Sequence, residues 1–142
     1  MNVILENTAK ISISSSTKNL MEVRNFIEVN AMKYLSDSNI INQIILSVDE
    51  ACTNIIKHTY KFDENHTIEI ENVISKNQFI VKISYNGDEF DPNKRSIPDM
   101  KEYFAKYKVG GLGIPLMKKF MDKIDYLHTI NNFNELTMVK YI

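Results

Sequence analysis

The sequence predicts an α+β fold, a two-layer α/β sandwich in which a mostly antiparallel sheet carries three main helices on one face. Several segments alternate apolar and polar residues as strands do, and three others carry apolar residues at helical spacing. The expected order is strand, helix, helix, strand, strand, helix, strand, strand. Because helices fall before and between pairs of strands, neighbouring strands are expected to pair antiparallel and leave the other sheet face open to a partner.

Size and composition limit the class of protein. A chain of 142 residues suits one domain spanning residues 1–142. Its net charge of −1, without blocks of like charge, gives no electrostatic footprint for nucleic acid or an anionic membrane. Neither a signal peptide nor a run of about 18 apolar residues is present, so no membrane span is indicated. The single cysteine, Cys52, cannot form an internal disulfide, and a reducing cytoplasm fits.

The first strand and helix are expected before residue 35. Residues 10–14 alternate Ile11 and Ile13 with polar neighbours, as a short strand does. Residues 15–17 are two serines and a threonine, which favour a helix N-cap. A helical stripe follows, formed by Leu20, Val23, Ile27, Ala31 and Tyr34.

The second helix is expected from about residue 39 to residue 60, after N-cap candidates at 36–38. Its apolar stripe includes Cys52, which is therefore expected in the core rather than as a nucleophile. Glu50, Asn54 and His58 stand at i, i+4 and i+8, a spacing that places them on one helix face away from that stripe. Taken alone, such a face is most often simply solvated.

The rest of the chain predicts a hairpin, an irregular segment, a helix and two strands. Residues 66–74 and 79–85 alternate around a polar turn and form the hairpin. Residues 87–113 are irregular, with a short amphipathic helix near 100–107, and such long irregular segments are usually functional or mobile. A helix starts at Ile114-Pro115, and final strands are expected near 125–130 and 135–142. The buried face of this last helix is expected to consist of Met117, Phe120, Met121 and Ile124.

A glycine-rich turn precedes that last helix. Gly110, Gly111 and Gly113 allow close backbone approach to a ligand, and the helix start presents unpaired N–H groups, so the turn suits an anion. A flexible hinge explains the glycines equally well. A second turn, NGDEFDP at residues 86–92, leaves the end of a strand.

Together with the polar helix face, these turns resemble the GHKL, or Bergerat-fold, ATPases, and most of all the bacterial anti-sigma factor serine kinases, the RsbW-like group. Residues 50–60 match that family's N box, E-A-x-T-N-x-x-x-H-x-Y. Its first glycine box, D-x-G-x-x-F-D, is matched at Gly87, Phe90 and Asp91, and its second, G-G-L-G, at residues 110–113. The resemblance covers residues 10–142.

The resemblance implies a cytoplasmic anti-sigma factor that is an ATP-dependent serine/threonine kinase using Mg²⁺. Glu50 would be the general base and Asn54 a magnesium ligand. The phosphate cradle and the rest of the ATP site would comprise His58, Tyr85, Gly87, Gly110, Gly111, Leu112 and Gly113. The implied partners are a small antagonist protein that carries the acceptor serine, a sigma factor and a second copy in a homodimer.

One position departs from the family pattern. Where the family has an aspartate that binds the adenine amine, this chain has Tyr85. Loss of that contact alone costs roughly 1–3 kcal/mol, a five- to hundredfold loss in affinity. The alternative is therefore a non-catalytic partner-switch binding module with an altered nucleotide pocket. A subsidiary hypothesis is that Glu135, on the neighbouring strand, supplies the missing carboxylate.

Overall fold

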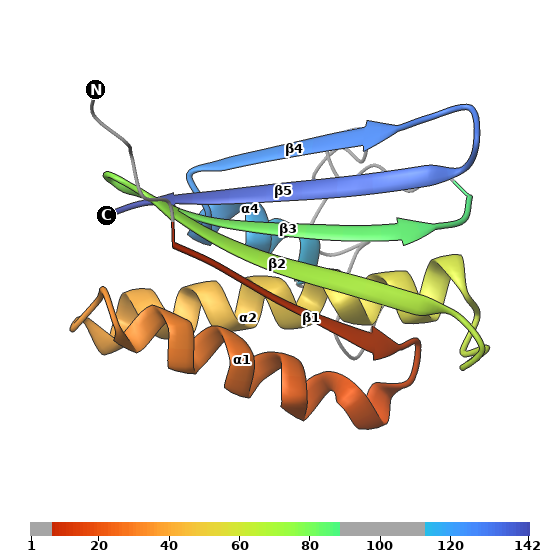
Figure 1. Ribbon diagram of the computed structural model, residues 1–142, viewed down its shortest axis with the longest axis horizontal. Helices are drawn as coiled ribbons and strands as arrows, with labels where there is room; N and C mark the ends of the chain where they lie inside the picture. Colours follow the sequence, from red (N-terminus) through yellow and green to blue (C-terminus); the bar gives the residue numbers. More distant parts are fainter. Residues whose placement is uncertain (1–6, 89–112) are drawn as a thin grey trace.

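The fold is built on a five-stranded antiparallel sheet (Figure 1). The computed structural model describes residues 7–88 and 113–142, with side chains in the second range described from residue 116. The strands are β1 (Asn7–Ser14), β2 (Thr67–Ser75), β3 (Gln78–Asn86), β4 (Lys123–His128) and β5 (Phe133–Tyr141). Their order is β1-β2-β3-β5-β4, and each neighbouring pair is antiparallel. The expected antiparallel sheet is confirmed.

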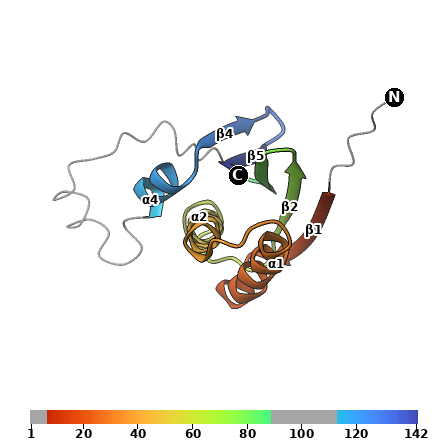
Figure 2. The same cartoon turned by 90° about the vertical axis from the view of Figure 1, so that its left-hand side faces the viewer.

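The helices lie together on one face of this sheet (Figure 2). They are α1 (Leu20–Met32), α2 (Ser38–Asn54) and α4 (Gly113–Phe120). A 3-10 turn (Thr17–Asn19) leads into α1, and one π-helical turn, η2 (Ile55–Thr59), extends α2. The sheet curves over the helical layer, and α2 lies between α1 and α4. The two-layer arrangement is therefore confirmed, while the expected short helix near 100–107 lies outside the described residues.

Local capping and turn chemistry explains most of the element boundaries. The Asp37 carboxylate accepts from the backbone N–H groups of Asn39 (2.9 Å) and Ile40 (3.4 Å), so α2 starts where its cap predicts. Ser16 accepts from the Lys18 N–H at 3.3 Å and caps the 3-10 turn. The β2–β3 hairpin turns at Lys76, whose φ of 39° is left-handed.

Two residues of the expected helical stripes lie outside those helices, and Ile130, expected in a strand, lies in the turn after β4. Tyr34 was expected on the α1 stripe, but the helix ends before it and its side chain is 40% exposed. Ile124 was expected on the buried face of the last helix, and it lies in β4 instead. The reason is that the backbone N–H of Asp122 already donates to the Val139 carbonyl at 2.8 Å, so the chain has joined the sheet by residue 122.

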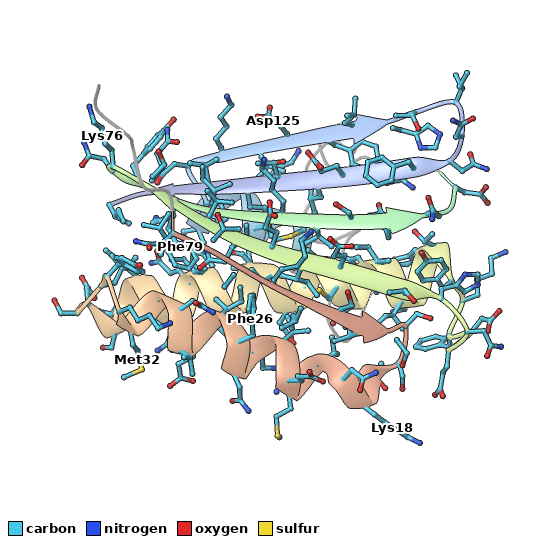
Figure 3. The ribbon with its side chains drawn as sticks, viewed as in Figure 1. Lys18, Phe26, Met32, Lys76, Phe79 and Asp125 are labelled. Atoms are coloured by element: carbon cyan, nitrogen blue, oxygen red, sulfur yellow. The ribbon has the colours of Figure 1, made fainter. Side chains whose placement is uncertain are left out.

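The core lies between the two layers. One row of inward-facing residues crosses the sheet in register at Ile11, Ile70, Ile83, Leu136 and Tyr126. Figure 3 shows Phe79 of β3 and Phe26 of α1 pointing into this layer, whereas Lys18, Met32 and Asp125 point outward. Cys52 is fully buried, as expected for a core residue.

The outer face of the sheet is polar. Lys10 pairs with Glu69 at 2.6 Å and approaches Glu71 at 3.9 Å across the β1–β2 ladder. Burial on this face would leave these charges without water, which is costly, so the helices cover only the inner face. Within the two described ranges, no helix combines the length and apolar character needed to cross a bilayer.

Candidate functional site

The polar face of α2 carries the two residues expected to do the chemistry. Glu50 and Asn54 are partly exposed, while Val48 and Cys52 on the apolar stripe are fully buried. Partial burial raises the pKa of the Glu50 carboxyl, and the neighbouring Asp49 charge raises it further, against a smaller lowering by Lys57. A carboxylate with a raised pKa is a better proton acceptor than an ordinary surface glutamate, which suits a general base.

Asn54 lies one helical turn beyond Glu50, and its amide nitrogen is buried. Its Nδ2 is inaccessible to solvent and has no hydrogen-bond partner among the residues that the structure describes. An unpaired buried amide costs roughly 1–3 kcal/mol, so such atoms concentrate where a ligand, ion or water completes the structure. A carboxamide oxygen is also a ligand that Mg²⁺ accepts. The residue therefore fits the neighbourhood of a bound phosphate and metal ion.

A π-turn directly follows Asn54 and changes the helix geometry. The Tyr60 N–H donates to the Ile55 carbonyl at 3.0 Å, a bond between residues five apart. Thr59 is the last residue of this turn, five residues after Asn54. The Thr59 Oγ1 is likewise buried, with no partner in residues 7–88 or 113–142. Sequence reasoning missed Thr59, because a single π-turn leaves no signal in a pattern that reads as a continuous α-helix.

The same π-turn affects His58. The expected i+8 alignment with Glu50 assumes an unbroken α-helix, whereas α2 ends at Asn54 and the π-turn Ile55–Thr59 follows. His58 is partly buried within the π-turn. Its place at the phosphate end of a ligand site stays a prediction.

The end of this helix packs against the turn that follows β3. Gly87 has a φ of 152°, which favours glycine. A Cβ at this position would lie 2.5 Å from Thr59 Cγ2 and 3.6 Å from Tyr60 Cε1. The two segments matched to the N box and to the first glycine box are therefore in direct contact, although they are distant in sequence.

An aromatic cluster occupies the end of β3. The Tyr85 side chain is 3% exposed and meets Tyr60 edge-on, with ring centroids 6.4 Å apart. Tyr60 donates from its hydroxyl to the Asn86 carbonyl at 2.5 Å and stacks on His66 at 4.1 Å. Tyr85 thus faces the helical layer, where the resemblance places the adenine-binding aspartate, and its ring packs there against Tyr60.

The proposed substitute for that aspartate is wrong. Glu135 pairs with Ser84 and lines a hollow on the outer sheet face with Lys10, Glu69 and Lys82. Alternation along β5 then turns Asn134 inward, directly opposite Tyr85. Glu135 cannot reach a ligand bound on the inner face, because the sheet lies between them.

The glycine-rich turn is only partly described. Gly113 begins α4, so the helix expected to start near Ile114-Pro115 is confirmed. Gly110, Gly111 and Leu112 lie outside the described residues, as do Phe90 and Asp91 of the first glycine box. The expected burial is confirmed at Met117 of α4 and at Met121, the residue directly after it, which are 1% and 4% exposed.

Comparison with known sequences gives a consistent set of relatives. Residues 13–140 match the family described as the histidine kinase-like ATPase domain. The chain is 31% identical over 109 residues to the serine-protein kinase RsbW of Bacillus subtilis, covering 72% of this chain and 65% of that protein. It is 32% identical over 117 residues to RsbW of Bacillus thuringiensis, covering 80% and 70% respectively. The chain therefore spans about two thirds of the length of these relatives.

Solved structures share the fold at low identity. A crystal structure of the RsbU and RsbW domains of a Mycobacterium tuberculosis protein has a TM-score of 0.62 at 11% identity, covering 95% of this chain and 32% of that one. The Pseudomonas aeruginosa SiaB–SiaC complex has a TM-score of 0.61 at 12% identity, covering 94% and 89%. These likenesses establish the arrangement of helices and strands.

Proposed function

Because the chain belongs to the family of histidine kinase-like ATPase domains, we propose that it is an ATP-dependent serine/threonine protein kinase that acts on an anti-sigma-factor antagonist. The kinase and its antagonist belong to a partner-switching pathway, in which the kinase also binds a sigma factor. It works in the cytoplasm. The relatives named serine-protein kinase RsbW support this proposal. The SiaB–SiaC complex supports a protein partner for this fold.

The observation that carries the proposal is that Glu50 and Asn54 lie one turn apart on α2, and that the π-turn extending this helix packs against Gly87. Glu50 has a raised pKa and is available to accept the proton of a serine hydroxyl as that oxygen attacks. Asn54 would be a ligand of the Mg²⁺ and the glycine turns would bind the phosphates of ATP, and the metal ion would supply charge neutralisation when bound. Phosphoryl transfer depends mainly on positioning and charge, so this small set of groups suffices.

Thermal denaturation with ATP and Mg²⁺ tests the nucleotide site first. Nucleotide at 100 times its Kd adds about 2.7 kcal/mol to the free energy of unfolding, which raises the Tm by on the order of 10 °C. Absence of any ATP-dependent shift at millimolar nucleotide would overturn the kinase proposal. The Glu50→Gln variant keeps the shift and loses phosphate transfer to the antagonist. Glu135→Gln, the same chemical change on the opposite sheet face, keeps both.

A second function is favoured by the packing of Tyr85. Its ring is buried against Tyr60. Because tyrosine carries a phenol, this position offers no carboxylate to an adenine amine. A partner-switch module that binds proteins without catalysis would explain this change. Calorimetry separates the two functions: the module predicts that ATP binds Tyr85→Asp and does not bind the wild-type chain. Equal ATP affinity of the wild type, Tyr85→Asp and Tyr85→Phe would remove the basis for the module.

A further inference from the structure

We propose that Asn134 is a positioning residue that holds the Gly87 turn in place and thereby sets nucleotide affinity. The effect on affinity rests on the proposed nucleotide site, whereas the hold on the turn does not. Asn134 is fully buried in β5, and its cross-strand partners are Tyr85 on one side and His128 on the other. All three therefore stand in one row at the same end of the sheet's inner face.

The amide nitrogen of Asn134 donates hydrogen bonds to three backbone carbonyl groups at and near the turn. Nδ2 donates to the Gly87 oxygen at 2.9 Å and to the Tyr85 and Asn132 oxygens at 3.3 Å each. The Gly87 N–H in turn donates to the same Asn132 carbonyl at 2.8 Å. One side chain thus ties the end of β3, the Gly87 turn and the β4–β5 turn together.

These contacts also determine the orientation of the amide. Carbonyl oxygens only accept hydrogen bonds, so the side of the amide that faces three of them must be the NH₂ group. The Asn134 Oδ1 then faces the Tyr126 hydroxyl, and it lies 2.6 Å from His128 Nδ1. Because Oδ1 only accepts, both of these groups must donate. Neutral His128 therefore carries its proton on Nδ1.

The position of the turn matters for the site because of what it touches. Gly87 is in contact with Thr59 and Tyr60, at the end of the helix that carries Asn54. A shift of the turn would move this wall of the site relative to Asn54. An aspartate at position 134 has the shape of asparagine but no N–H donors, and its carboxylate would face three carbonyl oxygens. Shape alone therefore cannot replace the amide at this position.

The test combines three measurements on the wild type, Asn134→Asp and the control Glu135→Gln, the next residue on the opposite face. Nitrogen-15 NMR at alkaline pH reads the His128 tautomer in the wild type. Hydrogen exchange compares the Gly87 amide with the Ile83 amide in the middle of β3. Calorimetry measures the Kd for ATP with Mg²⁺.

We expect the Nδ1–H tautomer in the wild type. In Asn134→Asp we expect Gly87 to exchange at least about tenfold faster at unchanged Ile83 exchange, and ATP to bind about tenfold more weakly, because more than one hydrogen bond is lost. Glu135→Gln should match the wild type in exchange and affinity. A merely structural role would speed the exchange of both amides together.

Three results would overturn the proposal. The first is an Nε2–H tautomer of His128 in the wild type, a result that stands even if Asn134→Asp does not fold. The second is unchanged Gly87 exchange in Asn134→Asp. The third is equal ATP affinity of Asn134→Asp and the wild type, which removes the role in nucleotide binding and leaves the kinase proposal intact. If the wild type binds no ATP, the kinase proposal fails, while the tautomer and the Gly87 exchange still decide whether Asn134 holds the turn.

Discussion

Replacement of Gly87 by alanine tests the contact between the end of α2 and the turn after β3. The added Cβ would lie 2.5 Å from Thr59 Cγ2, a distance that forces one of the two groups to move. The φ of 152° adds a second cost, since residues with a side chain rarely adopt it. The variant is therefore expected to destabilise the fold through two separable effects.

The magnitude follows from adding the two effects. A side chain in such a backbone conformation costs about 1–3 kcal/mol. Thr59 is β-branched, and pushing it off its rotamer costs about 0.5–1.5 kcal/mol more. The sum is about 1.5–4.5 kcal/mol of unfolding free energy, or on the order of 10 °C in Tm for a chain of this size.

Urea denaturation of a double-mutant cycle measures the two effects separately. Thr59→Ser removes Cγ2 and keeps the hydroxyl, so in that background Gly87→Ala should retain only the backbone cost and lose about 1 kcal/mol of its effect. Asp88→Ala, the next residue along and exposed, is the control and should stay within about 0.5 kcal/mol of the wild type. An equal cost of Gly87→Ala in both backgrounds would refute the contact with Thr59, and a cost below about 0.5 kcal/mol would refute the whole argument.

Two further predictions concern α2. The raised pKa of Glu50 means that the folded state holds its proton more tightly than the unfolded state, so the contribution of Glu50 to stability is lost as pH rises above its ordinary value of 4.5. Glu50→Gln should therefore raise the Tm at pH 7 and leave it unchanged near pH 3; a lower Tm at pH 7 would contradict this. Asp37→Ala removes the N-cap and should cost about 1 kcal/mol in urea denaturation. Ser36→Ala is its control, and equal loss in both variants would argue against the cap.

Element type was predictable wherever the signal was local. Alternation predicted the β2–β3 hairpin, because each side chain in a strand faces the side opposite to its neighbours. Asp37 predicted the start of α2, since a cap acts on backbone groups two and three residues away. Ile124 was assigned to the helix because an apolar residue four positions after Phe120 suits a helix as well as a strand. Only the pairing of β4 with β5 decides between the two.

In the candidate site, too, the features that depend on local spacing were predictable and those that depend on strand pairing were not. Glu50 and Asn54 were predictable as neighbours, because one helical turn separates them. The outward direction of Glu135 was not, because it depends on the register between β3 and β5. The π-turn that places Thr59 beside Gly87 was also invisible, since the pattern of apolar residues through Ile55 is that of a regular helix.

The sequence by itself determined the fold class, the polar face of α2, and the presence of Tyr85 at the end of β3, where the resemblance implies an aspartate. These features depend on periodicity, capping and residue identity, which act over a few positions. Only the tertiary structure decided that Asn134, rather than Glu135, faces Tyr85, and that its amide joins Gly87 to His128. The physical reason is that a hydrogen bond between residues 47 apart exists only after two strands pair in one register, and no local pattern records that register.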